Sequence, residues 1–222
     1  NGAMNPGYST GDAIKAIEEV TAQVLPANYT YEYSGLTKEE NSAGSQTIII
    51  FILSLVFVYF LLSAQYESYI LPFAILLSLP VGIAGAIGFI NLAGLENNIY
   101  FQIALIMLIG LLSKNAILIV EFALQRRKHG MSILESALDG AKARLRPILM
   151  TSFAFIFGLM PLALSTGIGA IGNRSIGMSA VGGMLIGTIF GVFIIPALYV
   201  IFQTQQERIT GAPQETIEES KN

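Results

Sequence analysis

Residues 99–122 read IYFQIALIMLIGLLSKNAILIVEF, an apolar run in which Lys114 is the first charged residue and Glu121 the second. A run of roughly 20 apolar residues is long enough to cross the ~30 Å hydrocarbon core of a bilayer as a helix. A lysine near the middle of such a helix costs roughly 2.5–3.5 kcal/mol on insertion scales, so it is normally paired and marks an ion or proton path. The stretch therefore predicts a membrane-spanning helix in which Lys114 has a function.

The composition of the chain indicates the same environment. Of its 222 residues, 53% are hydrophobic and only 12% are charged, well below the roughly 25% charged that is usual in soluble domains. The net charge of −3 lacks the basic excess of a nucleic-acid-binding protein. There is no cysteine, and the single histidine, His129, lies in a basic, polar stretch, so neither a thiolate metal site nor a catalytic histidine is indicated. We expect a membrane protein that is not an enzyme and holds no metal and no cofactor.

Five apolar segments are each long enough to span a bilayer, at 47–64, 69–92, 99–122, 145–164 and 178–202. Residues 46–203 therefore predict an all-α bundle of five transmembrane helices. The connection at 124–146 carries six cations, whereas 91–98 and 165–177 together carry only Arg174. The positive-inside rule then places 124–146 and the C-terminus in the cytoplasm and the N-terminus on the opposite face, which in a bacterium would be the periplasm.

Residues 1–45 are polar and predict a short α+β segment. Residues 9–12 have the spacing of a capping box, and apolar residues follow at helical intervals up to Val24. Residues 29–34 alternate aromatic and polar side chains, which is the period of a strand. Because one helix and one strand cannot bury a core, we interpret residues 1–45 as the end of a larger α+β domain. A disordered extension is the alternative.

Two further polar segments lie on the cytoplasmic side of this topology. Residues 131–143 begin with capping-box spacing and carry one apolar face, which indicates an amphipathic helix at the membrane interface. A helix packed under the bundle accounts for that pattern equally well. Residues 204–222 are polar and acidic and are expected to form a disordered tail.

Small residues mark a face of the last span. Gly183, Gly187 and Gly191 recur at four-residue intervals, and in lipid such residues let helix backbones approach closely. We interpret them as a helix-packing face; a sliding or gating surface is the alternative.

The partner of Lys114 is the open question in this sequence. The other four spans contain no carboxylate, and Glu121 is roughly 10 Å away along the helix and near its end. Lys114 is therefore either neutral or paired with a residue outside this chain, and Ser113 and Asn115 beside it complete the densest polar patch within the spans. A lysine that reaches the interface is one alternative. A retinal Schiff base is another, but it needs an intramembrane carboxylate and an aromatic pocket, and the chain has no tryptophan.

The motifs around Lys114 resemble a known family. GLLSKNAILIVEF at 110–122 followed by RLRPILMTS at 144–152 closely resembles the resistance–nodulation–division (RND) transporters, specifically the acriflavine-resistance group of drug-efflux pumps. Further matching stretches are PGYSTG at 6–11, AQYES at 64–68, NIYFQ at 98–102, GLMPL at 158–162 and SIGM at 175–178. The resemblance extends over essentially the whole chain.

The resemblance implies a role for the chain and for named residues. These spans would be the last five of twelve in a bacterial inner-membrane drug/proton antiporter, preceded by the end of a periplasmic porter region. Lys114, Thr151 and Arg144 match the relay lysine, the relay threonine and the arginine at the cytoplasmic proton entry, with Ser113 and Asn115 as neighbours. The acidic pair of the relay would lie in the N-terminal half of the pump, outside this chain.

The family also implies partners and leaves alternatives. The implied partners are that N-terminal half, two further copies in a homotrimer, a periplasmic adaptor, an outer-membrane channel, the lipid bilayer, and amphiphilic drugs bound upstream. Another RND-type exporter, for metals or for assisting protein export, is one alternative, although the methionines in the spans have no acidic companions. A truncated membrane fragment that transports nothing is the other.

Overall fold

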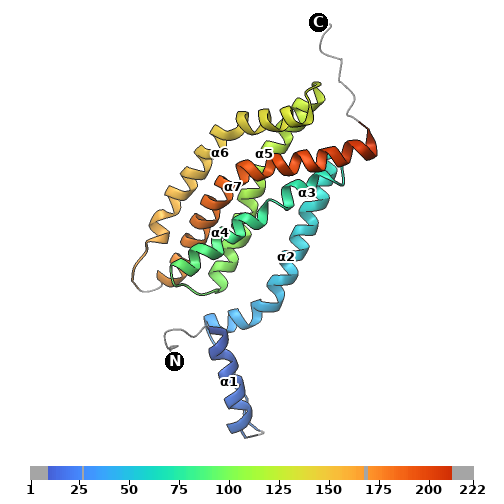
Figure 1. Ribbon diagram of the computed structural model, residues 1–222. Coiled ribbons are helices and arrows are strands. Elements are labelled where there is room, and N and C mark those ends of the chain that lie inside the picture. The colour runs from blue at the N-terminus through green and yellow to red at the C-terminus, as the bar shows by residue number, and fades with distance from the viewer. Residues whose placement is uncertain (1–9, 27, 168–169, 212–222) are drawn as a thin grey trace.

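The computed structural model describes residues 10–26, 28–167 and 170–211. These residues form a helical bundle with no strand, shown in Figure 1. The helices are α1 (Thr10–Val24), α2 (Leu36–Tyr66), α3 (Leu71–Leu76), α4 (Leu79–Leu92), α5 (Ile99–Lys128), α6 (Ile133–Ala163) and α7 (Ala170–Thr210).

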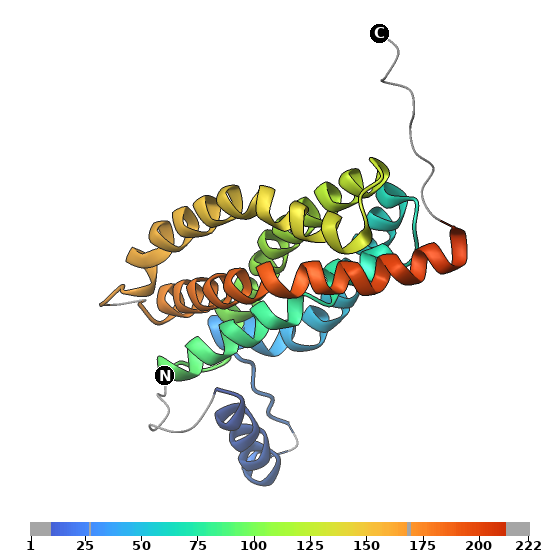
Figure 2. The same cartoon turned by 45° about the horizontal axis from the view of Figure 1, so that its top comes forward.

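The expectation of a helical bundle with five membrane-spanning segments is confirmed. Five stretches are long and apolar enough to cross a membrane, namely Ile49–Tyr66, Leu71–Leu92, Ile99–Lys128, Ile133–Ala163 and Ala170–Ile209. Helix α7 runs between α4 and α6 in both views and also packs against α5 (Figures 1 and 2). These four helices form the body of the bundle, while α2 lies at its margin.

The second apolar segment is interrupted rather than continuous. It forms α3 and α4, with a break at residues 77–78. Pro80 has no N–H to donate, and its ring clashes with the carbonyl group four residues earlier, which disfavours an unbroken helix. The Ser78 hydroxyl donates to the carbonyl oxygen of Ile75 at 2.6 Å, so part of the backbone hydrogen bonding lost at the break is replaced.

Residues 131–143 and 145–164 do not form two helices, as the sequence suggested, but one. Helix α6 begins at Ser132, whose hydroxyl accepts the N–H of Glu135 while the Glu135 carboxylate reaches back to the Ser132 N–H. Gly140 lies inside the helix, where a glycine costs about 1 kcal/mol relative to alanine but does not end the helix. The helix therefore continues into the fourth apolar segment.

The direction of α6 changes along its length. Its first part lies across the end of the bundle, and the rest turns to run beside α7 (Figure 1). Pro147 lies inside the helix, where a proline removes one backbone hydrogen bond and bends the helix axis. This proline is the physical reason for the change of direction.

Helix α7 is also longer than its predicted span of 178–202. Residues 204–210, predicted to belong to a disordered tail, continue the helix. An ion pair between Glu207 of α7 and Arg127 of α5 stabilises these last turns, which is a tertiary contact that the local composition does not indicate. The rest of the predicted tail, residues 212–222, lies outside the described residues.

The predicted α+β segment is only partly formed. The predicted helix is present as α1, but residues 29–34 form no strand among the described residues. A strand is stabilised by hydrogen bonds to a neighbouring strand, and the described part of the chain supplies none. The polar residues from Leu36 onward are continuous with the first span as α2.

Candidate functional site

Lys114 lies on the outward face of α5. Its neighbours Ser113 and Asn115 are 7% and 8% exposed, whereas Lys114 itself is exposed. Successive residues of a helix are about 100° apart, so Lys114 and Asn115 leave the helix in different directions. Exposed Ile106 and Gly110, eight and four residues earlier, continue the Lys114 face. The described helices therefore leave the Lys114 side chain exposed, while Ile106 and Gly110 also line a pocket shared with α2.

Lys114 has no hydrogen-bond or ion-pair partner among the described residues. Glu121, the nearest acidic residue along the helix, instead accepts a hydrogen bond from Gln125 at 3.2 Å. The arrangement fits the expectation of a partner outside this chain. It separates Lys114 from Ser113 and Asn115, which the sequence grouped with it.

Thr151 repeats this pattern on α6. It is exposed, and its hydroxyl donates to the carbonyl oxygen of Ile148 on its own helix at 3.0 Å. The next residue, Ser152, is buried and accepts a hydrogen bond from the Thr188 hydroxyl of α7 at 2.9 Å. No hydrogen bond joins Thr151 to Lys114 in the part of the chain described here. Both predicted relay groups thus face outward, while the polar residues beside them face the bundle.

Arg144 lies in the first half of α6, before the apolar part of that helix. Its guanidinium carbon is 4.4 Å from the centre of the Phe122 ring of α5, a geometry that attracts a cation to the negative ring face. Its Nε is buried and has no hydrogen-bond partner within the described residues. The structure does not bring Arg144 into contact with Lys114 or Thr151.

The glycines of α7 differ in what they contact. A Cβ at Gly183 would lie 2.1 Å from Leu108 and 3.0 Å from the carbonyl oxygen of Gly82. One at Gly187 would lie 2.8 Å from Leu112 and 3.2 Å from the Cα of Gly82. A Cβ at Gly191 would meet only Ile195 of its own helix, at 3.5 Å. Two of the three glycines therefore lie where α4, α5 and α7 meet, and the third does not.

Two tertiary contacts between α5 and α7 were not predicted. At the start of α5, the Asn98 amide donates to the Ser175 hydroxyl at 2.9 Å, and its carbonyl oxygen accepts the N–H of Phe101 at 3.0 Å. At the other end, Arg127 donates two hydrogen bonds of 2.7 Å to Glu207 and a third of 2.7 Å to the carbonyl oxygen of Met131. Asn98 and Ser175 lie in the stretches at 98–102 and 175–178 that match the family. Spacing along the chain, however, cannot show that two such distant residues are in contact.

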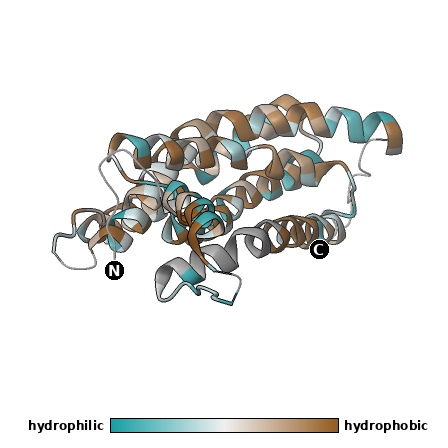
Figure 3. Cartoon of the chain, turned by 90° about the horizontal axis from the view of Figure 1, so that it is seen from below, coloured by the Kyte–Doolittle hydropathy of each residue, from teal (hydrophilic) through white to brown (hydrophobic). Residues whose placement is uncertain are grey.

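The outer faces of α2 and α6 are apolar and exposed. Both helices bury a smaller share of their apolar windows than the α3–α4 segment and α5 do, and much of the ribbon in Figure 3 is brown, the colour of hydrophobic residues. The exposed residues include Ile52, Phe57, Phe60, Met150, Phe153 and Phe157. Apolar surface of this extent is suited to lipid or to further helices.

The chain matches the model of the AcrB/AcrD/AcrF family over residues 1–203. It belongs to this family. A similar protein is the toluene efflux pump membrane transporter TtgB of Pseudomonas putida, 43% identical over 199 residues. Two others are the solvent-resistant pump membrane transporter SrpB of Pseudomonas putida, 44% identical over 201 residues, and the multidrug resistance protein MdtF of Escherichia coli, 41% identical over 203 residues.

These alignments cover most of this chain and a small part of its relatives. They include 90%, 90% and 91% of the chain but only 19%, 19% and 20% of TtgB, SrpB and MdtF. The chain thus spans about a fifth of the length of the curated relatives it matches. Together with the five apolar helices, membership of the family identifies a multi-pass membrane protein of the RND drug-efflux group.

Proposed function

We propose that this chain is the C-terminal membrane part of a proton-driven efflux pump that exports amphiphilic drugs or solvents across the bacterial inner membrane. The observation that carries the proposal is the position of Lys114. It is exposed in the middle of an apolar helix and has no charged partner among the described residues. An unpaired ammonium facing hydrocarbon is costly, so the face around Lys114 is one that an acidic group on another part of the pump would cover.

The relay that the family resemblance implies is consistent with this placement. Two carboxylates on the N-terminal half of the pump pair with protonated Lys114 and hold one arrangement of the helices. When a carboxylate takes up a proton, that attraction weakens, and Lys114 is free to turn toward the Thr151 hydroxyl on the neighbouring helix. Because the two arrangements differ in charge pairing, proton uptake shifts the equilibrium between them. Arg144, at the end of the predicted cytoplasmic loop, has the charge and position to act at the proton entry.

The remaining assignments follow from the family. In this proposal residues 1–45 lie in the periplasm, as the end of an α+β porter region that continues elsewhere in the pump, and the C-terminus lies in the cytoplasm; the excess of cations at 124–146 supports this orientation. The pump is a homotrimer that works with a periplasmic adaptor and an outer-membrane channel. The exposed apolar faces of α2 and α6 support contact with lipid and with the N-terminal half.

A chimaeric pump tests this function. Residues 1–203 replace the aligned segment of TtgB in cells that lack their own pumps, and energised efflux of a fluorescent amphiphile is measured. We expect efflux by the chimaera and its loss in Lys114→Ala at an unchanged amount of membrane-inserted trimer. Lys128→Ala, an exposed lysine on the same helix, is the matched control and retains efflux. Efflux by Lys114→Ala at the level of the unmodified chimaera would contradict the relay.

A further inference from the structure

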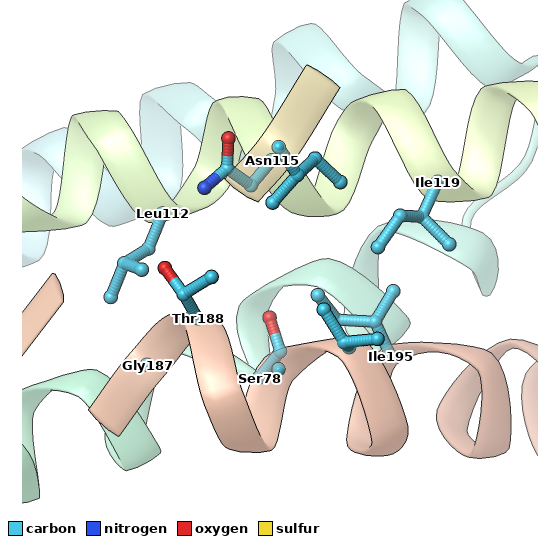
Figure 4. A pocket seen from close by; sticks show the side chains of 10 residues that line it. Ser78, Leu112, Asn115, Ile119, Gly187, Thr188 and Ile195 are labelled. Carbon is cyan, nitrogen blue, oxygen red and sulfur yellow. The ribbon is translucent and has the colours of Figure 1, made fainter. Parts of the chain in front are cut away.

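The interior of the bundle contains a small cavity with polar residues on two sides. It lies between α5, α6, α7 and the break between α3 and α4. Asn115 faces it from α5, and Thr188 and Ser78 face it from the opposite side (Figure 4). The rest of the lining is apolar and includes Leu112, Ile119 and Ile195. We infer that this cavity is a binding site for one ordered water molecule, held by Asn115, Thr188 and Ser78.

An unpaired hydrogen-bond donor points to a missing partner in the cavity. Asn115 is 8% exposed, and its amide nitrogen Nδ2 has no hydrogen-bond partner among the described residues. Leaving such a donor unpaired costs roughly 1–3 kcal/mol, and native proteins usually pair a buried polar group with protein or with ordered water. Asn115 therefore requires an acceptor within this space.

The two hydroxyl groups opposite Asn115 are available as acceptors and not as donors. The Ser78 hydroxyl donates to the carbonyl oxygen of Ile75 at 2.6 Å, and the Thr188 hydroxyl donates to Ser152 at 2.9 Å. Each oxygen has a lone pair left. A water molecule matches this set, because it accepts one hydrogen bond from Asn115 and donates one each to Ser78 and Thr188. With this orientation of the Asn115 amide a cation does not match the set, because the N–H group would face it.

The size of the cavity also fits a single water molecule. The volume available to the centre of a water molecule is about 10 Å³. This is close to the minimum for a single buried water, which typically makes about three hydrogen bonds. A larger ligand does not fit, and an empty cavity of this kind is expected only where the lining is apolar.

The water links three parts of the bundle at the level of Lys114. It joins the middle of α5 to α7 and to the break in the second apolar segment. Asn115 follows Lys114 directly, so a fixed Asn115 amide also fixes the rotation of α5 that turns Lys114 outward. Asn115 is thus a positioning residue. The inference rests on the cavity alone and does not depend on the proposed transport function.

A structure of the chimaeric pump at a resolution that shows ordered water tests the site. We expect an isolated density peak within hydrogen-bond distance of Asn115 Nδ2 and of the Ser78 and Thr188 hydroxyl oxygens. The peak disappears in Asn115→Leu and remains in Asn91→Leu, a change of an exposed asparagine on α4. An empty cavity in the unmodified protein, in a map that shows other buried waters, would overturn the inference. Direct contact of Asn115 with either hydroxyl would do so too.

Hydroxyl-radical footprinting in ¹⁸O-labelled water gives a second readout that does not depend on the variant folding. Radicals formed from a bound water label the side chains beside it, so we expect labelling of Leu112 and Ile119 in the unmodified pump. Leu108, which is fully buried on the same helix and does not line the cavity, is the internal control and stays unlabelled. Equal labelling of all three, or of none, would contradict a specific water site.

Discussion

The two sides of helices α5 and α6 differ in what they leave unpaired. On the inner side, Ser152 is hydrogen-bonded to Thr188 of α7, and glycines bring backbones into contact with neighbouring helices. On the outer side, Lys114 and Thr151 are exposed and bond to no other described helix. The inner side packs against other helices of this chain, and its unpaired Asn115 amide faces the cavity between them. The outer side carries exposed polar groups that have no partner on another described helix. Substitutions on the inner side should therefore change stability, and those on the outer side should change transport.

Among the contacts between the inner sides of these helices and α7, the largest expected effect of a substitution is at Gly177 of α7, which faces α6. A Cβ there would lie 2.4 Å from the Ala163 nitrogen and 2.8 Å from the Leu162 carbonyl carbon, and backbone atoms of α6 cannot move aside easily. We expect Gly177→Val to destabilise the bundle by about 3 kcal/mol or more, measured by thermal unfolding in detergent. Gly158→Val is the control, because its Cβ would meet nothing within 4 Å. Equal melting temperatures for the two variants would refute the close contact.

A smaller loss is expected at the Arg127–Glu207 pair. These side chains are only 19% and 13% exposed, and hydrogen bonds to charged groups contribute roughly 1.5–3 kcal/mol. We expect Glu207→Gln to cost about 2 kcal/mol of unfolding free energy. The control is Asp139→Asn in the Arg126–Asp139 pair, whose side chains are 43% and 41% exposed; it should change stability by less than about 1 kcal/mol. Equal losses of unfolding free energy in Asp139→Asn and Glu207→Gln would contradict this prediction.

The adjacent residues Thr151 and Ser152 give the most direct comparison of the two sides. Ser152→Ala removes the acceptor of the buried Thr188 hydroxyl and should cost about 1 kcal/mol, with efflux retained. Thr151→Ala removes a bond within its own helix, so stability should stay within about 0.5 kcal/mol, while efflux by the chimaera falls. Thr151→Ser should restore efflux because it restores the hydroxyl. The distinction between the sides is wrong if Ser152→Ala stops efflux and Thr151→Ala does not.

The smallest effect is expected at Gly191. Its Cβ would meet only Ile195 of the same helix at 3.5 Å, and alanine favours a helix over glycine by up to about 1 kcal/mol. We expect Gly191→Ala to leave stability unchanged or slightly raised, whereas Gly187→Ala should lower it because of Leu112 and the Gly82 backbone. Thermal unfolding of the two variants side by side measures the difference. An equal loss of stability in Gly191→Ala and Gly187→Ala would instead indicate that all three glycines belong to one packing face.

The sequence predicted those features that depend on local composition. Hydropathy located all five spans, because crossing a bilayer requires a long apolar helix wherever the rest of the chain lies. The charge of Lys114 identified the candidate site because an isolated charge within an apolar span is costly wherever the rest of the chain lies. Even the interruption by Pro80 has a local cause.

The features that the sequence did not predict depend on distant partners. Asn98 meets Ser175, and Arg127 meets Glu207, across 77 and 80 residues of chain, and no local pattern pairs them. The extension of α7 past residue 203 depends on the second contact. Residues 29–34 have the alternation of a strand but form none, because the described chain offers no neighbouring strand. The grouping of Ser113 and Asn115 with Lys114 overlooked the rotation of a helix between adjacent residues.

The two contacts between α5 and α7 also limit how the helices can slide. Asn98 holds Ser175 near one end, and Arg127 holds Glu207 near the other. A shift of one helical turn along the axis is about 5.4 Å, which would break both contacts at once. A slide of α5 along α7 by one turn is therefore opposed at both ends of the pair. The exposed Lys114 lies on α5 between these two contacts.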